Sequence, residues 1–217
     1  LQVAMQVAGL LPAGDVKEQR YSLSKLPKLT HYCADAACVV MQCDWGKKGS
    51  RFALDFSDSE ICIEALAKNG TPVLAGEWTV QVELEQQSQL QLDEWSEVCW
   101  FSDDDVDYLE LEAKFGQHAR VQRQALLFRQ DRMLLLADAL LCDQVGQWSL
   151  SSRIPLAGDA KFEPAQKTTE GVIVTAGGTR CLTLPLHLPE WRRQATSGSL
   201  DANDETLNSQ QRGNGQR

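Results

Sequence analysis

The sequence has few histidines and lacks the short motifs that mark common catalytic sites. Its three histidines, His31, His118 and His187, lie far apart, and none has a second histidine or paired cysteines at metal-binding spacing. A Gly-x-Ser-x-Gly motif, a phosphate-binding loop and a dinucleotide fingerprint are also absent. We therefore expect no metal, no cofactor and no self-sufficient set of catalytic residues in this chain.

Long hydrophobic runs and positive charge are also scarce. No stretch approaches the roughly 20 apolar residues of a transmembrane helix, and residues 1–11 lack the charged start and cleavage site of a signal peptide. The 217 residues include 30 acidic and 21 basic side chains, which gives a formal net charge of −9. We expect neither a membrane nor a nucleic acid as partner, and an acidic polysaccharide would be repelled unless Lys and Arg were concentrated in one groove.

Cysteine is plentiful, but its spacing is not that of a zinc site. Among the seven cysteines, Cys33, Cys38 and Cys43 recur every five residues, which matches none of the short paired spacings of structural zinc. Several others fall within strand-like patterns, where a free cysteine behaves as a small hydrophobe. Free thiols are favoured over disulfides and metal ligands, and they point toward a reducing compartment; localisation is otherwise unknown, since a targeting signal could be missing.

Alternation of apolar and polar residues dominates the chain from position 37 onward. Phe52, Leu54 and Phe56 occupy alternate positions of one such segment. Similar segments recur at close spacing, and no sustained helical periodicity lies between them. This pattern predicts an all-β fold, an antiparallel β-sandwich. Later strands are expected at 95–101, 107–114, 119–129, 132–141, 147–154, 171–176 and 179–186.

We interpret residues 1–193 as a single β-sandwich domain, because all-β domains often reach about 200–250 residues without a boundary. Residues 1–11 could be a short helix or another strand. The segment 194–217 is rich in Ser, Asn, Gln and Gly, with only Leu200 and Leu207 as large apolar side chains, which predicts a polar disordered tail or linker. Because the chain begins at Leu1 rather than at a methionine, we interpret it as a piece of a longer protein.

Two turns and one core are expected from local sequence. The pair Asn69-Gly70 is a strong hairpin signal, and Gln130-Asp131 is expected to join two long strands. The alternation on those long strands predicts that five leucines share one core. They are Leu109, Leu111, Leu127, Leu134 and Leu136.

Arginines on the two strands that flank Gln130-Asp131 allow two interpretations. Arg123 and Arg129 are candidates for binding carboxylate or sulfate groups, because a guanidinium matches these anions bidentately. They could equally form ion pairs with carboxylates on a neighbouring strand, in particular with the acidic run 103–107. That run itself is expected to be a solvated turn rather than a calcium loop.

Two tryptophans are the best candidates for contact with a sugar ring. Trp45 lies beside a Gly-Lys-Lys-Gly turn, and Trp191 lies in the sequence LPEWRR at 188–193. Exposed aromatic rings stack on sugar rings, although packing within the protein is the alternative for both. His118 is a further candidate contact, with an ordinary surface or core histidine as its alternative.

Three segments together resemble the β-sandwich of the heparinase II/III-like family of polysaccharide lyases, over residues 37–141. They are MQCDW at 41–45 with RFALDF at 51–56, residues 63–74 ending in TPVL, and VQRQALLF at 121–128 with LLLAD at 134–138. The resemblance implies a large twisted antiparallel supersandwich attached to an upstream α/α toroid, with cleavage by β-elimination at the interface. An Asn, a Tyr and a His, which lie mostly in the toroid, would carry that chemistry. The family's His-containing loop, metal-site Asp and His-Asn element have no counterpart here, so no catalytic or metal residue is carried over.

Three functions remain open from the sequence. The first is a non-catalytic or accessory domain of a larger protein that acts on or binds polysaccharide. The second is the C-terminal half of an active polysaccharide lyase, with Arg123, Arg129 or His118 touching an acidic sugar and an upstream domain of the same polypeptide as neighbour. The third is a protein–protein interaction domain, which a flat apolar patch would favour over a concave face with exposed Trp and Arg.

Overall fold

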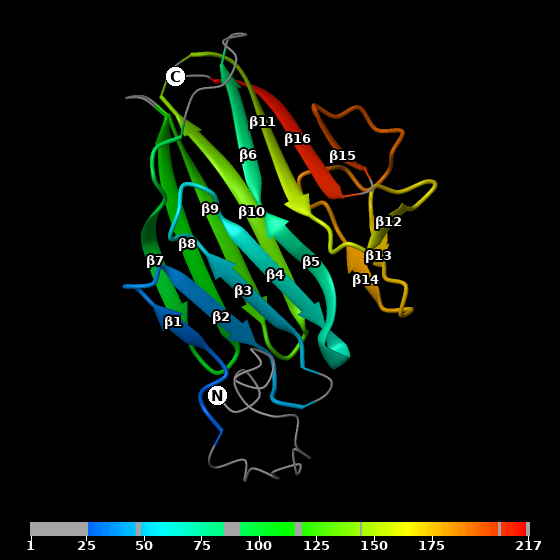
Figure 1. Cartoon of the computed structure of the whole chain (residues 1–217). Coiled ribbons are helices and arrows are strands. Elements are labelled where there is room, and N and C mark those ends of the chain that lie inside the picture. Colours follow the sequence, from blue (N-terminus) through cyan, green and yellow to red (C-terminus); the bar gives the residue numbers. More distant parts are fainter. Residues whose placement is uncertain are drawn as a thin grey trace.

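The fold is that of a computed structural model, which describes residues 26–46, 49–84, 92–115, 119–143, 145–203 and 205–215. Within these ranges the chain is nearly all β, and the strands form antiparallel sheets (Figure 1). The prediction of an all-β, antiparallel fold is confirmed. Residues 1–11, for which a short helix or strand was expected, lie outside the described residues, as does His118. No helix in the described part is long and apolar enough to cross a membrane.

The first sheet is a five-stranded meander in which each strand pairs with the next. Val39, Phe52 and Leu54 point to one face and are buried, while the residues between them are more exposed. The predicted hairpin at Asn69-Gly70 is confirmed: both residues have positive φ, 62° and 70°, which suits a tight turn between right-twisted strands. The strands are β1 (His31–Cys33), β2 (Cys38–Gln42), β3 (Arg51–Asp55), β4 (Cys62–Ala67) and β5 (Thr71–Glu77), with the 3-10 turn η2 (Lys68–Gly70) before β5.

The second sheet contains three long strands and one shorter edge strand. Leu127 pairs with Leu134 across the turn 129–132, so the predicted junction at Gln130-Asp131 is confirmed. Arg132 lies in this turn with φ of 52°. The strands follow the order β10-β9-β8-β7, with β7 (Ser96–Ser102), β8 (Val106–Phe115), β9 (Ala119–Phe128) and β10 (Met133–Cys142).

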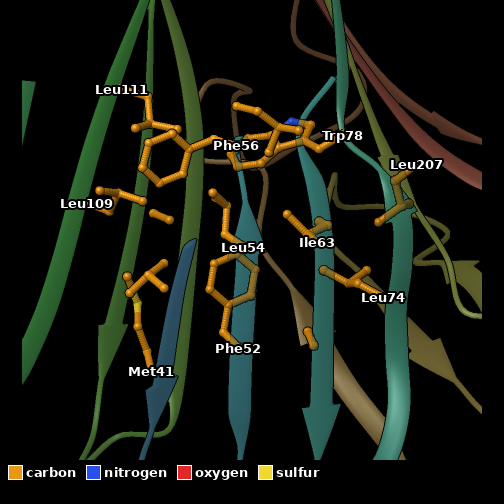
Figure 2. Packing of buried hydrophobic residues seen from close by; sticks show 14 of the residues in the cluster. Met41, Phe52, Leu54, Phe56, Ile63, Leu74, Trp78, Leu109, Leu111 and Leu207 are labelled. Atoms are coloured by element: carbon orange, nitrogen blue, oxygen red, sulfur yellow. The ribbon is translucent and has the colours of Figure 1, made fainter. Parts of the chain in front are cut away.

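Much of the core lies between these two sheets. Leu109 and Leu111 of β8 point toward the first sheet (Figure 2). There they meet Met41 of β2, Leu54 of β3 and Phe56, which directly follows β3. Of the five leucines expected to share one core, Leu109, Leu111 and Leu127 belong to the buried cluster, whereas Leu134 and Leu136 are partly buried against it. At one edge, Tyr32 of β1 stacks on Trp100 of β7, with ring centroids 5.1 Å apart.

The third sheet includes the end of the chain, which corrects one sequence-based prediction. The segment 194–217 was expected to be a disordered tail, but β15 (Gly198–Ala202) and β16 (Thr206–Gly215) pair with each other, and β16 also pairs with β11 (Gly146–Pro155). Ladder hydrogen bonds and the burial of Leu207, which is 3% exposed, order this polar segment. β6 (Thr79–Leu84) completes the order β15-β16-β11-β6, so the chain passes from the first sheet to the third at Trp78.

A small fourth sheet lies at the side of the molecule away from β1 and β7 (Figure 1). It consists of β12 (Lys161–Pro164), β13 (Gly171–Val174) and β14 (Arg180–Thr183), in that order. Ile173 of the central strand is buried and belongs to the core cluster. The connections around this sheet, before β13 and after β14, carry the candidate surface described below.

Candidate ligand-binding surface

Arg123, a sequence-predicted ligand contact, lies in the interior. Its side chain is 1% exposed, and Nε and Nη2 donate to Asp138 Oδ1 and Oδ2 at 2.7 and 3.0 Å. Nη1 donates to the carbonyl oxygen of Trp78, and the guanidinium stacks on the rings of Trp78 and Trp95 at 3.9 and 4.8 Å from their centroids. Its burial keeps Arg123 away from any ligand at the surface of this chain.

The Arg123–Asp138 pair is part of a network that joins the second and third sheets. Ser152 of β11 donates from Oγ to Asp138 Oδ2 at 2.6 Å, and Trp78 Nε1 donates to Ser152 Oγ at 2.9 Å. A buried ion pair is tolerated where further hydrogen bonds satisfy its remaining polar atoms, as they do here. The network therefore fixes the point where β5 passes into β6.

Arg129, the second sequence-predicted arginine, is also engaged internally. Nη2 lies 2.5 Å from Oδ1 of Asp107, whose side chain is fully buried, and the hydroxyls of Thr30 and Ser102 donate to the same carboxylate oxygen at 2.7 Å. Arg129 Nη1 also donates to the carbonyl oxygen of Asp103. This is the ion-pair alternative that the sequence offered, with a partner from the acidic run 103–107.

Trp45 is exposed, and its indole nitrogen is engaged by the backbone. Its side chain is 43% exposed, and Nε1 donates to the carbonyl oxygen of Pro27 at 3.0 Å. Asp44 precedes it in sequence and lies 3.7 Å from Arg132, so that the charge of this arginine is already paired.

The structure assembles a basic and aromatic surface around Trp191. The segments 165–170 and 189–194 lie side by side, because Thr169 N donates to Glu190 O at 3.0 Å and Arg192 N donates to Lys167 O at 3.1 Å. A β-bridge joins Thr168 to Trp191 between these two bonds. The pairing places Lys167 beside Arg192. We call Lys167, Trp191, Arg192 and Arg193 the Trp191 surface.

The side chains of the Trp191 surface are free to meet a ligand. All four residues are exposed, Trp191 by 49%. Arg192 Nε donates to the carbonyl oxygen of Ala165 at 3.0 Å, which orients its guanidinium, while Lys167 and Arg193 form no ion pair within the described part of the chain. Two carboxylates, Glu170 and Glu190, belong to the same two segments, and Glu170 accepts a hydrogen bond from Thr168 at 2.7 Å.

This arrangement combines an aromatic face with cations, the chemistry that suits an acidic sugar. Trp191, Arg192 and Arg193 were visible in the sequence as one short segment. Lys167 was missed, because it precedes β13 and reaches the site only through the bridge between Thr168 and Trp191. No local pattern in the sequence marks that contact.

One histidine and one tyrosine are among the titratable groups elsewhere whose pKa values are shifted. Burial lowers the pKa of His187 below its ordinary value, with an opposing hydrogen bond to the Ser199 backbone, and its Nε2 lies 3.2 Å from Ser209 Oγ. Burial, followed by the hydrogen bond that Tyr108 donates to Glu110, raises the pKa of Tyr108 far above its ordinary value. A phenol that resists ionisation is a poor general base.

Other surface features differ in character from the Trp191 surface. A depression near β7 and β8 is lined by Asp93, Glu94, Ser96, Glu112 and Lys114, whose excess of carboxylates would repel an acidic sugar. Leu182, Leu184 and Leu186 alternate along and after β14 with exposures of 66%, 56% and 77%, the apolar strip that a protein-partner interpretation requires. Within the described residues, no group of three or more His, Cys, Asp or Glu side chains is placed to hold a metal ion.

Comparison with solved structures places the fold among those of known lyases. The crystal structure of heparan sulfate lyase HepC from Pedobacter heparinus matches 85% of this chain with a TM-score of 0.63 and 11% sequence identity. A mutant of the same lyase and a heparinase III match with TM-scores of 0.60 and 0.59, each at 11% identity over 88% and 87% of this chain. No protein-family model and no curated protein matches the sequence. The chain spans only 34% to 37% of the length of these lyases, and the likeness is one of fold.

Proposed function

We propose that this chain is a non-catalytic, accessory β domain of a larger heparinase-like protein and that it binds an acidic polysaccharide through the Trp191 surface. The observation that carries the proposal is the pairing of segments 165–170 and 189–194, which brings three exposed cations and one exposed indole to neighbouring positions of the backbone. The fold likeness to heparan sulfate lyases supports the same ligand class.

The chemistry of the surface explains how a chain of net charge −9 would hold a polyanion. Sulfates and carboxylates accept charge-assisted hydrogen bonds from Lys167, Arg192 and Arg193, and the indole of Trp191 packs against the apolar face of a sugar ring. The surface lies on the connections around the fourth sheet, away from the acidic depression near β7 and β8 (Figure 1). Binding should therefore be local and should weaken as salt is added.

Binding of heparan sulfate oligosaccharides to the 217-residue chain, measured by calorimetry at two salt concentrations, tests the proposal. Trp191→Ala and Lys167→Ala should each weaken binding by about tenfold, which corresponds to about 1.4 kcal/mol. Trp45→Ala, which removes an exposed tryptophan from a different corner, is the matched control and should bind as the parent does. Equal affinity of the Trp191 and Trp45 variants, or equal binding of a neutral polysaccharide, would refute the proposal.

A second function is favoured by the difference in length. Because the chain spans about a third of the lyases that it matches, it could serve as one part of an active lyase whose remaining sequence supplies the catalytic residues. The 217-residue chain alone should then leave heparan sulfate uncleaved, while a longer protein that contains it should produce an unsaturated uronate. Cleavage by the chain alone would contradict the non-catalytic proposal, independently of the binding results.

A further inference from the structure

Two cysteines face each other directly across the hairpin of β1 and β2. Cys33 is the last residue of β1, Cys38 is the first residue of β2, and the register pairs them as Cα partners. The intervening turn is closed by a hydrogen bond from Ala37 N to Ala34 O at 3.1 Å. Opposed residues of an antiparallel pair have Cα atoms about 4.5–5.5 Å apart, within the range of about 4.4–6.8 Å that a disulfide requires.

Both side chains lie on the same face of the sheet and are accessible. Val39, the next residue of β2, points into the core, so Cys38 and its partner Cys33 point away from it. Both are free thiols of intermediate exposure. The pKa of Cys38 is raised by burial first, then by Cys33 and by Asp55 of the neighbouring strand, which agrees with two closely spaced thiols.

The hairpin also holds one edge of the molecule closed. β1 has only three residues and lies at the end of the first sheet, paired on one side by β2. Its central residue, Tyr32, points to the other face and stacks on Trp100 of β7, with an interplanar angle of 18°. A covalent link between β1 and β2 would therefore restrict the strand that connects the edges of the first and second sheets.

We propose that Cys33 and Cys38 form a reversible disulfide, with a low-molecular-weight disulfide such as oxidised glutathione as the oxidant, and that the link fixes β1 in place. The thiolate of one cysteine attacks a sulfur of the oxidant, which releases one glutathione thiolate and leaves a mixed disulfide. The second cysteine then displaces the second glutathione. The two protein thiols lose two electrons and two protons, and one glutathione disulfide becomes two thiols.

The test uses the full chain equilibrated in glutathione buffers of increasing oxidised fraction. Peptide mapping should show a single internal disulfide between Cys33 and Cys38, and hydrogen exchange of the β1 amides should slow by about tenfold, with a rise in Tm. Formation should accelerate between pH 7 and 9, because thiolate is the attacking species.

Matched variants separate this pair from the other thiols. Cys33→Ser should abolish both the link and the slowed exchange, whereas Cys62→Ser, on the same face of β4, should leave both unchanged. A stable mixed disulfide without internal closure, a link between Cys38 and Cys62, or closure only in unfolded protein would overturn the proposal. None of these results depends on whether the chain binds a polysaccharide.

Discussion

Arg123 of β9 and Asp138 of β10 are direct cross-strand partners, and their side chains meet through two hydrogen bonds in the interior. Both side chains are almost completely buried, at 1% and 2% exposure. The pair is linked through Ser152 to Trp78, where the chain leaves the first sheet. A charged pair thus occupies the junction of three sheets, a place where an apolar contact would be the ordinary solution.

Asp138→Ala should destabilise the protein by about 3–5 kcal/mol, because it leaves the Arg123 guanidinium buried without its counter-charge. Glu64→Ala breaks the ion pair between Arg51 and Glu64, whose side chains are 43% and 46% exposed, and should cost less than about 1 kcal/mol. Denaturant titration of both variants measures the difference. Similar losses of unfolding free energy would show that burial does not set the contribution of the Arg123–Asp138 pair to stability.

Leu109→Ala should cost about 2–5 kcal/mol, since Leu109 is 1% exposed and packs between the two large sheets. Leu134→Ala should cost clearly less, because Leu134 is only partly buried at the margin of the same cluster. The sequence alone predicted equal placement for these leucines. Chemical denaturation of the two variants side by side decides between equal burial, as the sequence predicts, and unequal burial, as in the structure.

Much of the antiparallel β fold was predictable because alternation is a direct consequence of the pleat. Phe52 and Leu54 alternate with outward residues, and the structure buries them as expected. The same rule places Arg123 on the inward face of β9, because it alternates in step with Val121, Ala125 and Leu127. The charge of Arg123 favoured a surface position in the sequence-based interpretation. Its burial is explained by partners that local sequence does not reveal, above all Asp138 on the neighbouring strand.

The end of the chain could not be predicted locally, because its order comes from a distant strand. Gly213 of β16 lies against Trp148 of β11, and an added Cβ there would approach Trp148 Cζ2 to 2.5 Å. A glycine that suggests flexibility in the sequence is thus the position on which an indole packs. The Trp191 surface is similar, because Lys167 joins it through backbone pairing that no local pattern reveals.

Truncation after Gln194 should lower Tm by several degrees, because it removes β15 and β16 and exposes one edge of β11. A disordered tail, as the sequence predicted, would instead leave Tm unchanged when it is removed. Leu207→Ala isolates the packing contribution and should cost about 2–5 kcal/mol, whereas Asp201→Ala, at an exposed position of β15, should be nearly neutral. An unchanged Tm after truncation would show that the paired strands contribute nothing to stability.

His187 should make the protein less stable as the pH falls from about 7 toward 5. Burial lowers the pKa of His187 in the folded state below the value of about 6.5 expected in the unfolded chain. The unfolded state therefore binds the proton more readily in this window, and stability is lost as the pH drops below the unfolded pKa. The contribution of neutral His187 to stability is fully present above the pKa of the unfolded chain.

The measurement is Tm as a function of pH for the parent chain and for His187→Gln. The variant should lose part of the decline between pH 7 and 5, because it removes the group whose protonation opposes folding. His31→Gln is the matched control, since His31 is exposed on β1, and it should follow the parent curve. Identical curves for His187→Gln and the parent would mean that protonation of His187 does not oppose folding. The contact between the half-buried ring and Ser209 of β16 would then contribute equally to stability in both protonation states of His187.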